Sequence, residues 1–209
     1  MKYKIFLISI FIILILVGCR EKSDEQLFYD VQKFITGLDS YTCTAYITIY
    51  GNKEPETYIV KQWYKAPDKY RIDIEKPEEL RGKTTIYNGN KVLIRHPKIG
   101  QGWIMENYKN TVEQKMFLGY FIHNYLNNEN GKIKKQTIKK IDYLLFETEI
   151  PGEHPYFNRE KLWFEIKKYY PYRLQILDIN GKIRVDIKYR NFEYNQKIED
   201  DVFKIHIKN

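Results

Sequence analysis

Apolar and polar residues alternate along most of the chain, and this alternation predicts β-strands. Residues 69–75, for example, read Lys-Tyr-Arg-Ile-Asp-Ile-Glu, so that the apolar side chains fall on one face of a strand and the charged side chains on the other. Asn88-Gly89-Asn90 and Asn180-Gly181 predict tight hairpins, because Asn-Gly readily adopts positive φ angles. The pattern predicts strands over residues 41–50, 57–65, 69–75, 84–87, 91–96, 141–150, 161–167, 172–179, 182–189 and 202–207.

Two segments show helical spacing instead. Ser23 and Gln26 have the spacing of a capping box, and a helix with one apolar face follows over about residues 24–37. A second helix with a broad apolar stripe is expected over about residues 110–126. A helix, several strands, another helix and several further strands predict an α+β fold, in which a curved antiparallel β-sheet carries the helices on its concave face.

The N-terminus has the organisation of a bacterial export signal. Two lysines in the first four residues precede an almost wholly apolar run over residues 5–17, which is short for a membrane span of about 20 residues. The sequence then reads Leu16-Val17-Gly18-Cys19, which resembles a lipobox, in which the Cys thiol is acylated. An uncleaved anchor helix is the alternative. We expect a signal peptide over 1–18, lipidation of Cys19 and a polar tether over 19–23.

Charge and chemistry-bearing residues point to a binding protein. The net charge is +8, but the basic residues alternate with apolar and acidic residues, which favours a solvated sheet face over a nucleic-acid site; weak attraction to an anionic membrane or cell-wall polymer stays open. Cys43 shares a strand face with Ala45 and Ile47, which favours a buried structural thiol over a nucleophile. No spacing typical of a zinc site occurs among the four histidines, which are His96, His123, His154 and His206. The sequence also contains no phosphate loop and no nucleophile elbow. We therefore expect no enzymatic activity, no metal and no cofactor.

Three motifs carry a family resemblance. Residues 63–72 contain the strand-turn-strand sequence Lys65-Ala66-Pro67-Asp68-Lys69-Tyr70-Arg71, the hairpin Tyr87-Asn88-Gly89-Asn90-Lys91 follows, and Asp200-Asp201-Val202-Phe203 comes near the end. In this order they resemble the lipoprotein-carrier (LolA-like) superfamily, and within it the chain is similar to the clostridial germination lipoproteins of the GerS type. The resemblance covers about residues 24–207. It implies a β half-barrel domain, here residues 24–209, whose concave side is plugged by helices.

The same resemblance implies a function. The first hypothesis is an accessory protein of spore germination, anchored by lipid outside the cytoplasmic membrane, that partners a cortex N-acetylmuramoyl-L-alanine amidase. Aromatic residues are frequent in protein interfaces, so the candidate contacts are Trp103, Tyr169, Tyr170 and Tyr172, with ordinary sheet packing as the alternative for each. The second hypothesis is a lipid or lipoprotein carrier with an apolar cavity. This hypothesis would be dismissed if the concave side were filled by the side chains of Phe117, Phe121 and Tyr125. A third is an envelope-stress sensor.

Overall fold

The computed structural model of the protein describes residues 23–106, 108 and 111–205. The predicted signal peptide and Cys19 lie outside the described residues, as does nearly all of the predicted tether. Within the described residues the strands form one sheet of eleven, in which every neighbouring pair is antiparallel. They are β1 (Ser40–Ile49), β2 (Glu56–Lys65), β3 (Lys69–Lys76), β4 (Thr84–Tyr87), β5 (Lys91–Arg95), β6 (Gly102–Glu106), β7 (Lys132–Ile138), β8 (Ile141–Glu149), β9 (Arg159–Glu165), β10 (Tyr170–Leu177) and β11 (Ile183–Tyr194).

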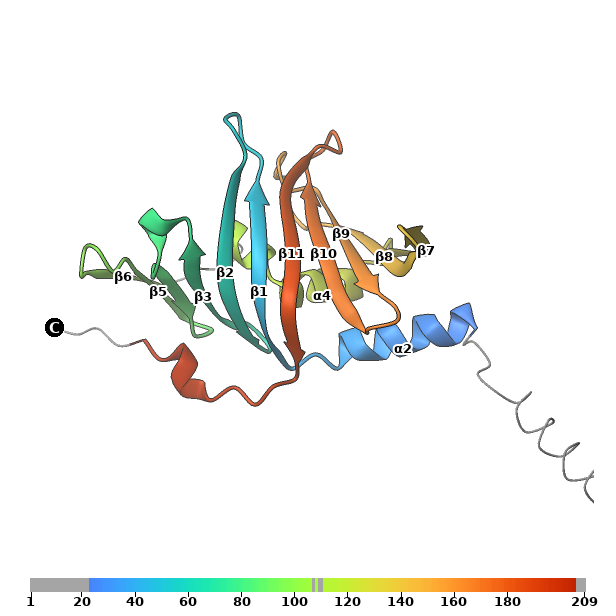
Figure 1. Cartoon of the computed structure of the whole chain (residues 1–209), viewed down its shortest axis with the longest axis horizontal. Helices are drawn as coiled ribbons and strands as arrows, with labels where there is room; N and C mark the ends of the chain where they lie inside the picture. Colours follow the sequence, from blue (N-terminus) through green and yellow to red (C-terminus); the bar gives the residue numbers. More distant parts are fainter. Residues whose placement is uncertain (1–22, 107, 109–110, 206–209) are drawn as a thin grey trace, which may run out of the picture.

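The sheet consists of two meanders that meet at its centre. The strand order is β6-β5-β4-β3-β2-β1-β11-β10-β9-β8-β7, so the chain runs outward from β1 to one edge and later returns from the other edge to β11. Between the two meanders, the helical segment crosses behind the sheet in the view of Figure 1, where α4 is seen through the strands. This open, curved sheet with helices on one face is the predicted fold class, which the structure confirms.

Helix α2 (Asp24–Thr36) closely follows its sequence prediction. The hydroxyl of Ser23 accepts a hydrogen bond from the backbone N–H of Gln26 at 3.3 Å and so caps the first turn. Phe34 packs its ring against Tyr194 and Phe164, with ring centroids 4.0 and 5.0 Å apart. The helix therefore packs against β9 and β11 of the second meander, along the lower ends of its strands in Figure 1.

The second predicted helix is divided into α3 (Val112–Lys115) and α4 (Leu118–Leu126). Phe117, between them, has an extended backbone with φ −94° and ψ 139°. Its buried ring lies 4.4 Å from that of Tyr70, and the hydroxyl of Tyr41 accepts a hydrogen bond from the backbone N–H of Leu118 at 3.2 Å. Packing of Phe117 into the sheet outweighs the helical propensity of the segment, which is why a single helix was the wrong prediction.

The C-terminal segment also departs from its prediction. Residues 202–207 were expected to form a strand, but Val202 and Phe203 belong to a 3-10 helix, η2 (Asp200–Phe203), and Lys204 and Ile205 form no strand. Phe203 packs with Ile86 and Leu93 in a second hydrophobic cluster. Because Tyr87 and Val92 belong to the main core, their chain neighbours Ile86 and Leu93 face the opposite, outer side of the sheet. The C-terminal segment therefore covers the outer face of the first meander instead of extending the sheet.

Candidate functional site

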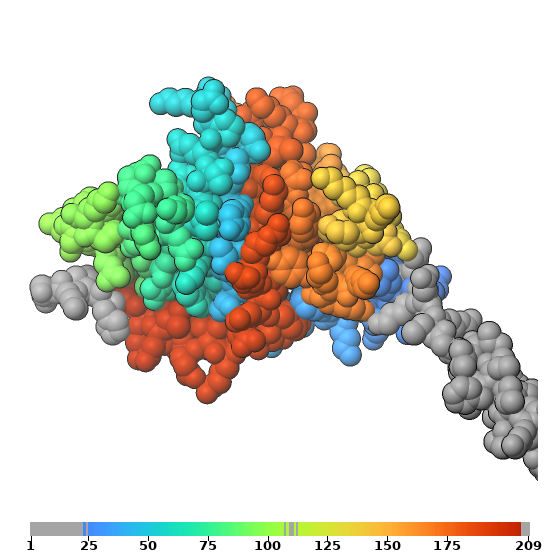
Figure 2. Space-filling view, viewed as in Figure 1, coloured from blue at the N-terminus to red at the C-terminus, as the bar shows by residue number. Residues whose placement is uncertain are grey.

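The outer face of the second meander lacks such a cover among the described residues, and it is hollowed. A cavity of about 640 Å³ lies between the β7–β8 hairpin and strands β10 and β11. We call it the outer-face groove and define it by six of the residues that line it: Tyr143, Glu165, Tyr170, Tyr172, Arg173 and Arg190. Figure 2 shows this face of the molecule, with β11 and β10 at its centre.

Exposed apolar side chains line one edge of the groove. Ile138 and Ile141 flank the turn between β7 and β8, and each is more than a third exposed. On the floor of the groove, the ring of Tyr172 lies 5.2 Å from that of the buried Tyr143. Burial raises the pKa of Tyr170 to about 12, so its hydroxyl stays protonated at neutral pH. The groove thus combines aromatic rings with an apolar lip.

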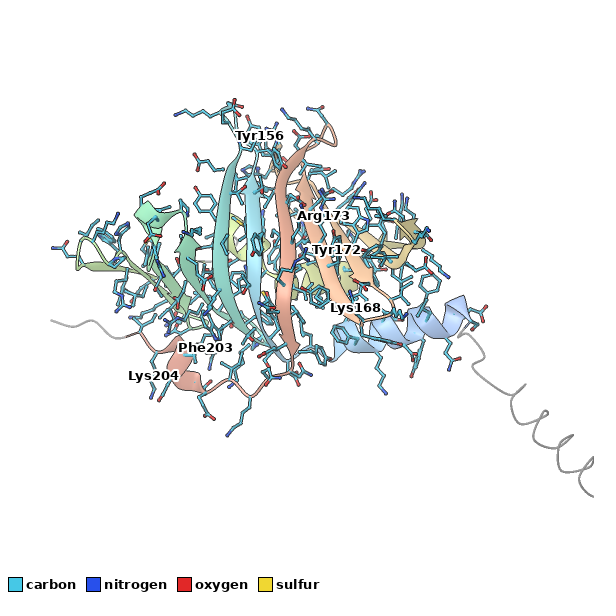
Figure 3. The ribbon with its side chains drawn as sticks, in the orientation of Figure 1. Tyr156, Lys168, Tyr172, Arg173, Phe203 and Lys204 are labelled. Carbon is cyan, nitrogen blue, oxygen red and sulfur yellow. The ribbon has the colours of Figure 1, made fainter. Side chains whose placement is uncertain are left out.

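A β-bulge brings Tyr172 and Arg173 to the same face. Along β10 the pairing with β9 advances from Pro171 to Arg173, whereas β9 advances by one residue from Phe164 to Trp163. Tyr172 is the extra residue, and a bulge of this kind redirects a side chain that regular alternation would send to the opposite face. Figure 3 shows Lys168, Tyr172 and Arg173 in succession along this part of the sheet, from the end near α2 upward.

Cationic side chains give the groove its charge. Arg173 forms an ion pair with Asp186, with Nε 2.5 Å from Oδ1, and lies over the ring of Trp163. The Nζ of Lys168 lies 3.0 Å from a carboxylate oxygen of Glu165. Arg190 lies over the ring of Tyr172, 5.8 Å from its centroid. Asp186 and Glu165 therefore already have a cationic partner each. The cationic side chains of the groove other than Arg173 and Lys168 are available to bind anions.

The structure separates the four aromatic residues that the sequence suggested as contacts. Tyr170 and Tyr172 both line the groove. Tyr169 faces α2 instead, where its hydroxyl donates a hydrogen bond to Asp30 at 3.2 Å. Trp103 is half exposed on β6, at the opposite edge of the sheet. Arg190, which sequence reasoning missed, joins the groove through tertiary structure alone.

The concave side is largely filled. Phe117 and Phe121 are buried in the main core, and Tyr125 packs against it. A cavity of about 230 Å³ remains beside Tyr64 and Gly119. Since a cavity of about 150 Å³ holds benzene, this space suits a small molecule better than the acyl chains of a lipoprotein. The filling that would dismiss a carrier is present.

Two reactive groups lie in the interior of the protein. The thiol of Cys43 is buried, as predicted, and donates a hydrogen bond to Gln62 Oε1 at 3.5 Å, and burial raises its pKa well above the usual range. The carboxyl group of Glu160 is also buried, and its Oε1 accepts a hydrogen bond from Asn124 Nδ2 at 2.6 Å. Burial raises the pKa of Glu160 to about 8, an effect that Asn124 and Lys115 oppose.

The described residues bring together no group of three His, Cys, Asp or Glu side chains suited to a metal ion. In the same part of the chain, every helix is too short or too polar to cross a bilayer. The candidate site is therefore the outer-face groove, a partly apolar, cationic surface on an open sheet.

An open antiparallel sheet, plugged by helices on its concave side and grooved on its outer face, defines an α+β half-barrel domain. The particular family follows from comparison with known proteins. The family model "Sporulation protein YdcC-like" matches residues 1–203, so the chain belongs to the YdcC-like sporulation proteins.

Individual relatives agree with this assignment. The sporulation protein YdcC of Bacillus subtilis (strain 168) is 23% identical over 203 residues, which are 96% of this chain; the chain spans 59% of that relative's length. The GerS lipoprotein, solved in complex with the CwlD amidase from Clostridioides difficile, is 35% identical, with a TM-score of 0.52, covering 85% of this chain and 99% of that chain. The predicted resemblance to GerS-type proteins is confirmed. A LolA superfamily protein from Nitrosomonas europaea is 13% identical over 88% of this chain and 99% of that chain, and its TM-score of 0.46 adds nothing to the assignment.

Proposed function

We propose that this protein is an accessory protein of spore germination that binds and supports a cortex N-acetylmuramoyl-L-alanine amidase and is not itself catalytic. One observation carries the proposal: GerS, 35% identical over nearly its whole length, was solved as a complex with the amidase CwlD. Membership of a sporulation family supports the same setting. The filled concave side leaves the carrier hypothesis without a specific observation in its favour.

The proposal includes a lipid anchor at Cys19. The lipobox-like residues Leu16-Val17-Gly18-Cys19 support it, and α2 begins at Asp24, five residues further on. Even a fully extended tether of this length reaches only about 17 Å. The domain would therefore work close to the outer surface of a membrane, with α2 and the nearby end of the second meander beside it. Two acyl chains would make this anchoring stable.

The outer-face groove is the contact surface that we propose for the amidase. Tyr and Arg are enriched among the residues that dominate interface energetics, and they do so in pockets that partners can desolvate. Tyr170, Tyr172 and Arg173 meet this description. Trp103 offers a separate exposed aromatic contact on β6, and Tyr169 would act only indirectly, through its contact with α2.

Co-purification tests the proposal. The acylated full-length protein, affinity-tagged and extracted from sporulating cells in mild detergent, should retain the organism's CwlD-type amidase. Tyr172→Ala should weaken this association at least tenfold, whereas Tyr29→Ala, which removes an exposed ring of α2 that does not line the groove, should leave it unchanged. Failure of the purified proteins to associate at micromolar concentration would refute amidase binding. Cleavage of spore peptidoglycan by the accessory protein alone would refute its non-catalytic role.

A further inference from the structure

Arg190, on the outer face, differs from the other arginines that stack on aromatic rings. Among the described residues, four arginines each lie over an aromatic ring, at 4.7 to 5.8 Å from its centroid. Three of them also form an ion pair with an aspartate: Arg71 with Asp73, Arg173 with Asp186 and Arg184 with Asp178. For the fourth, Arg190, the described residues provide no carboxylate partner.

Arg190 is nevertheless held in place. Its guanidinium lies over Tyr172, and its Nη1 donates a hydrogen bond to the backbone carbonyl of Tyr189 at 3.1 Å. A guanidinium carries five N–H donors, so most of them are left for a ligand. An arginine that is oriented in advance by an aromatic ring loses less side-chain entropy when it binds a carboxylate.

The surroundings of Arg190 favour an anion. It lines both the outer-face groove and an adjoining cavity of about 400 Å³ that also contains Lys188 and Tyr46. Five cationic and two acidic side chains line the two cavities together, and the two acids, Glu165 and Asp186, are already paired. A cleft lined by one sign of charge concentrates its field and attracts the opposite charge.

We propose that Arg190 is the anchor for a carboxylate on an acidic segment of the partner protein, which lies in the outer-face groove. This inference rests on the proposed function and adds the chemistry of the contact. A recessed groove with a buried tyrosine floor and an isoleucine lip accepts an extended segment with apolar side chains beside its acids, whereas a flat bilayer surface would not reach the floor. The planar guanidinium matches a carboxylate in bidentate geometry.

Charge substitution tests the anchor. The acylated full-length protein in phosphatidylcholine nanodiscs is titrated with the purified CwlD-type amidase at 50 and 300 mM salt. Arg190→Gln should raise Kd at least tenfold and flatten the salt dependence. Arg81→Gln, which removes an exposed arginine near η1 (Glu78–Leu80) on the other half of the sheet, should stay within twofold of wild type. Arg190 is exposed, so both variants should keep the wild-type melting temperature.

A second probe separates the anchor from the amidase. Hexaglutamate should bind the wild-type protein and the Arg81→Gln variant but not the Arg190→Gln variant. Binding of hexaglutamate through Arg190 without any binding of amidase would overturn the proposed function and support the anion site. Wild-type amidase affinity in Arg190→Gln, or equal binding of hexaglutamate by both variants, would overturn the anchor and leave amidase binding standing.

Discussion

Replacing Glu160 with Gln should make the protein more stable at neutral pH. The carboxyl group of Glu160 is fully buried on β9, and only one of its two oxygens, the acceptor from Asn124, has a hydrogen-bond partner among the described residues. Burial disfavours the charged form and raises its pKa to about 8. A Gln side chain keeps an oxygen acceptor for Asn124 and carries no charge at any pH.

The expected size of the effect follows from proton linkage. The pKa of Glu160 is raised from 4.5 to about 8, so the folded state holds a proton that the unfolded state releases as the pH rises through this window. The stabilisation is complete below about pH 4.5 and is lost as the pH approaches 8. At about 1.4 kcal/mol per pH unit, wild type should lose on the order of 3 kcal/mol between pH 4.5 and 7 that Glu160→Gln retains.

Urea unfolding of both proteins at five pH values between 4.5 and 9 measures this difference. The stability of Glu160→Gln minus that of wild type should increase with pH and level off above pH 8. Comparing the difference removes the contributions of all other titrating groups. Glu149→Gln, at an exposed position near the end of the neighbouring strand β8, controls for the loss of one acidic group. A difference that stays constant across the pH range would refute the linkage argument.

Three further outcomes are expected. Gly119→Ala should destabilise the protein by about 1–3 kcal/mol in urea unfolding, because the added methyl would lie 2.1 Å from Cζ of Tyr64; a gain in stability, the usual result of Gly→Ala within a helix, would contradict the close packing of α4. The thiol of Cys43 should resist iodoacetamide in the native protein and react once it is unfolded, since it is buried and its pKa is raised; rapid native labelling, read by mass spectrometry, would contradict this. Cys19→Ser should prevent lipidation, so that the protein is found either in the soluble fraction or with its signal peptide uncleaved, as immunoblotting of fractionated cells would show. Unchanged mature, membrane-bound protein would refute lipidation.

Alternation of apolar and polar residues made the central strands predictable, because a sheet with one buried face imposes that pattern. The two edge strands, β6 and β7, were not predicted. β6 reads Gly-Trp-Ile-Met-Glu and β7 reads Lys-Ile-Lys-Lys-Gln-Thr-Ile, and neither has a regular buried face. Lysines on an edge strand such as β7 oppose pairing with another chain. The position of an edge, and hence its composition, is a property of the whole sheet.

The candidate site was predictable only in part. The aromatic run Tyr169-Tyr170-Pro171-Tyr172 indicated a contact surface, but a bulge at Tyr172 decides which rings share a face, and the sequence carries no sign of it. Arg190 resembles the other basic residues that alternate along β11. That no described carboxylate pairs with Arg190 depends on where Asp178 and Asp186 lie in space, which no local pattern reveals.

The open groove also depends on where the chain goes after β11. At Asn195 the side-chain oxygen accepts hydrogen bonds from the backbone N–H groups of Asp39 and Ser40, and its amide nitrogen donates to the carbonyl of Gly37. These bonds fix the strand end against the start of β1, and the chain continues beneath the first meander. There Asp200 forms ion pairs with two lysines of β2 and β3, and Phe203 closes the outer hydrophobic cluster. Because the C-terminal segment packs on the first meander as far as Ile205, the described part of the chain leaves the outer face of the second meander uncovered.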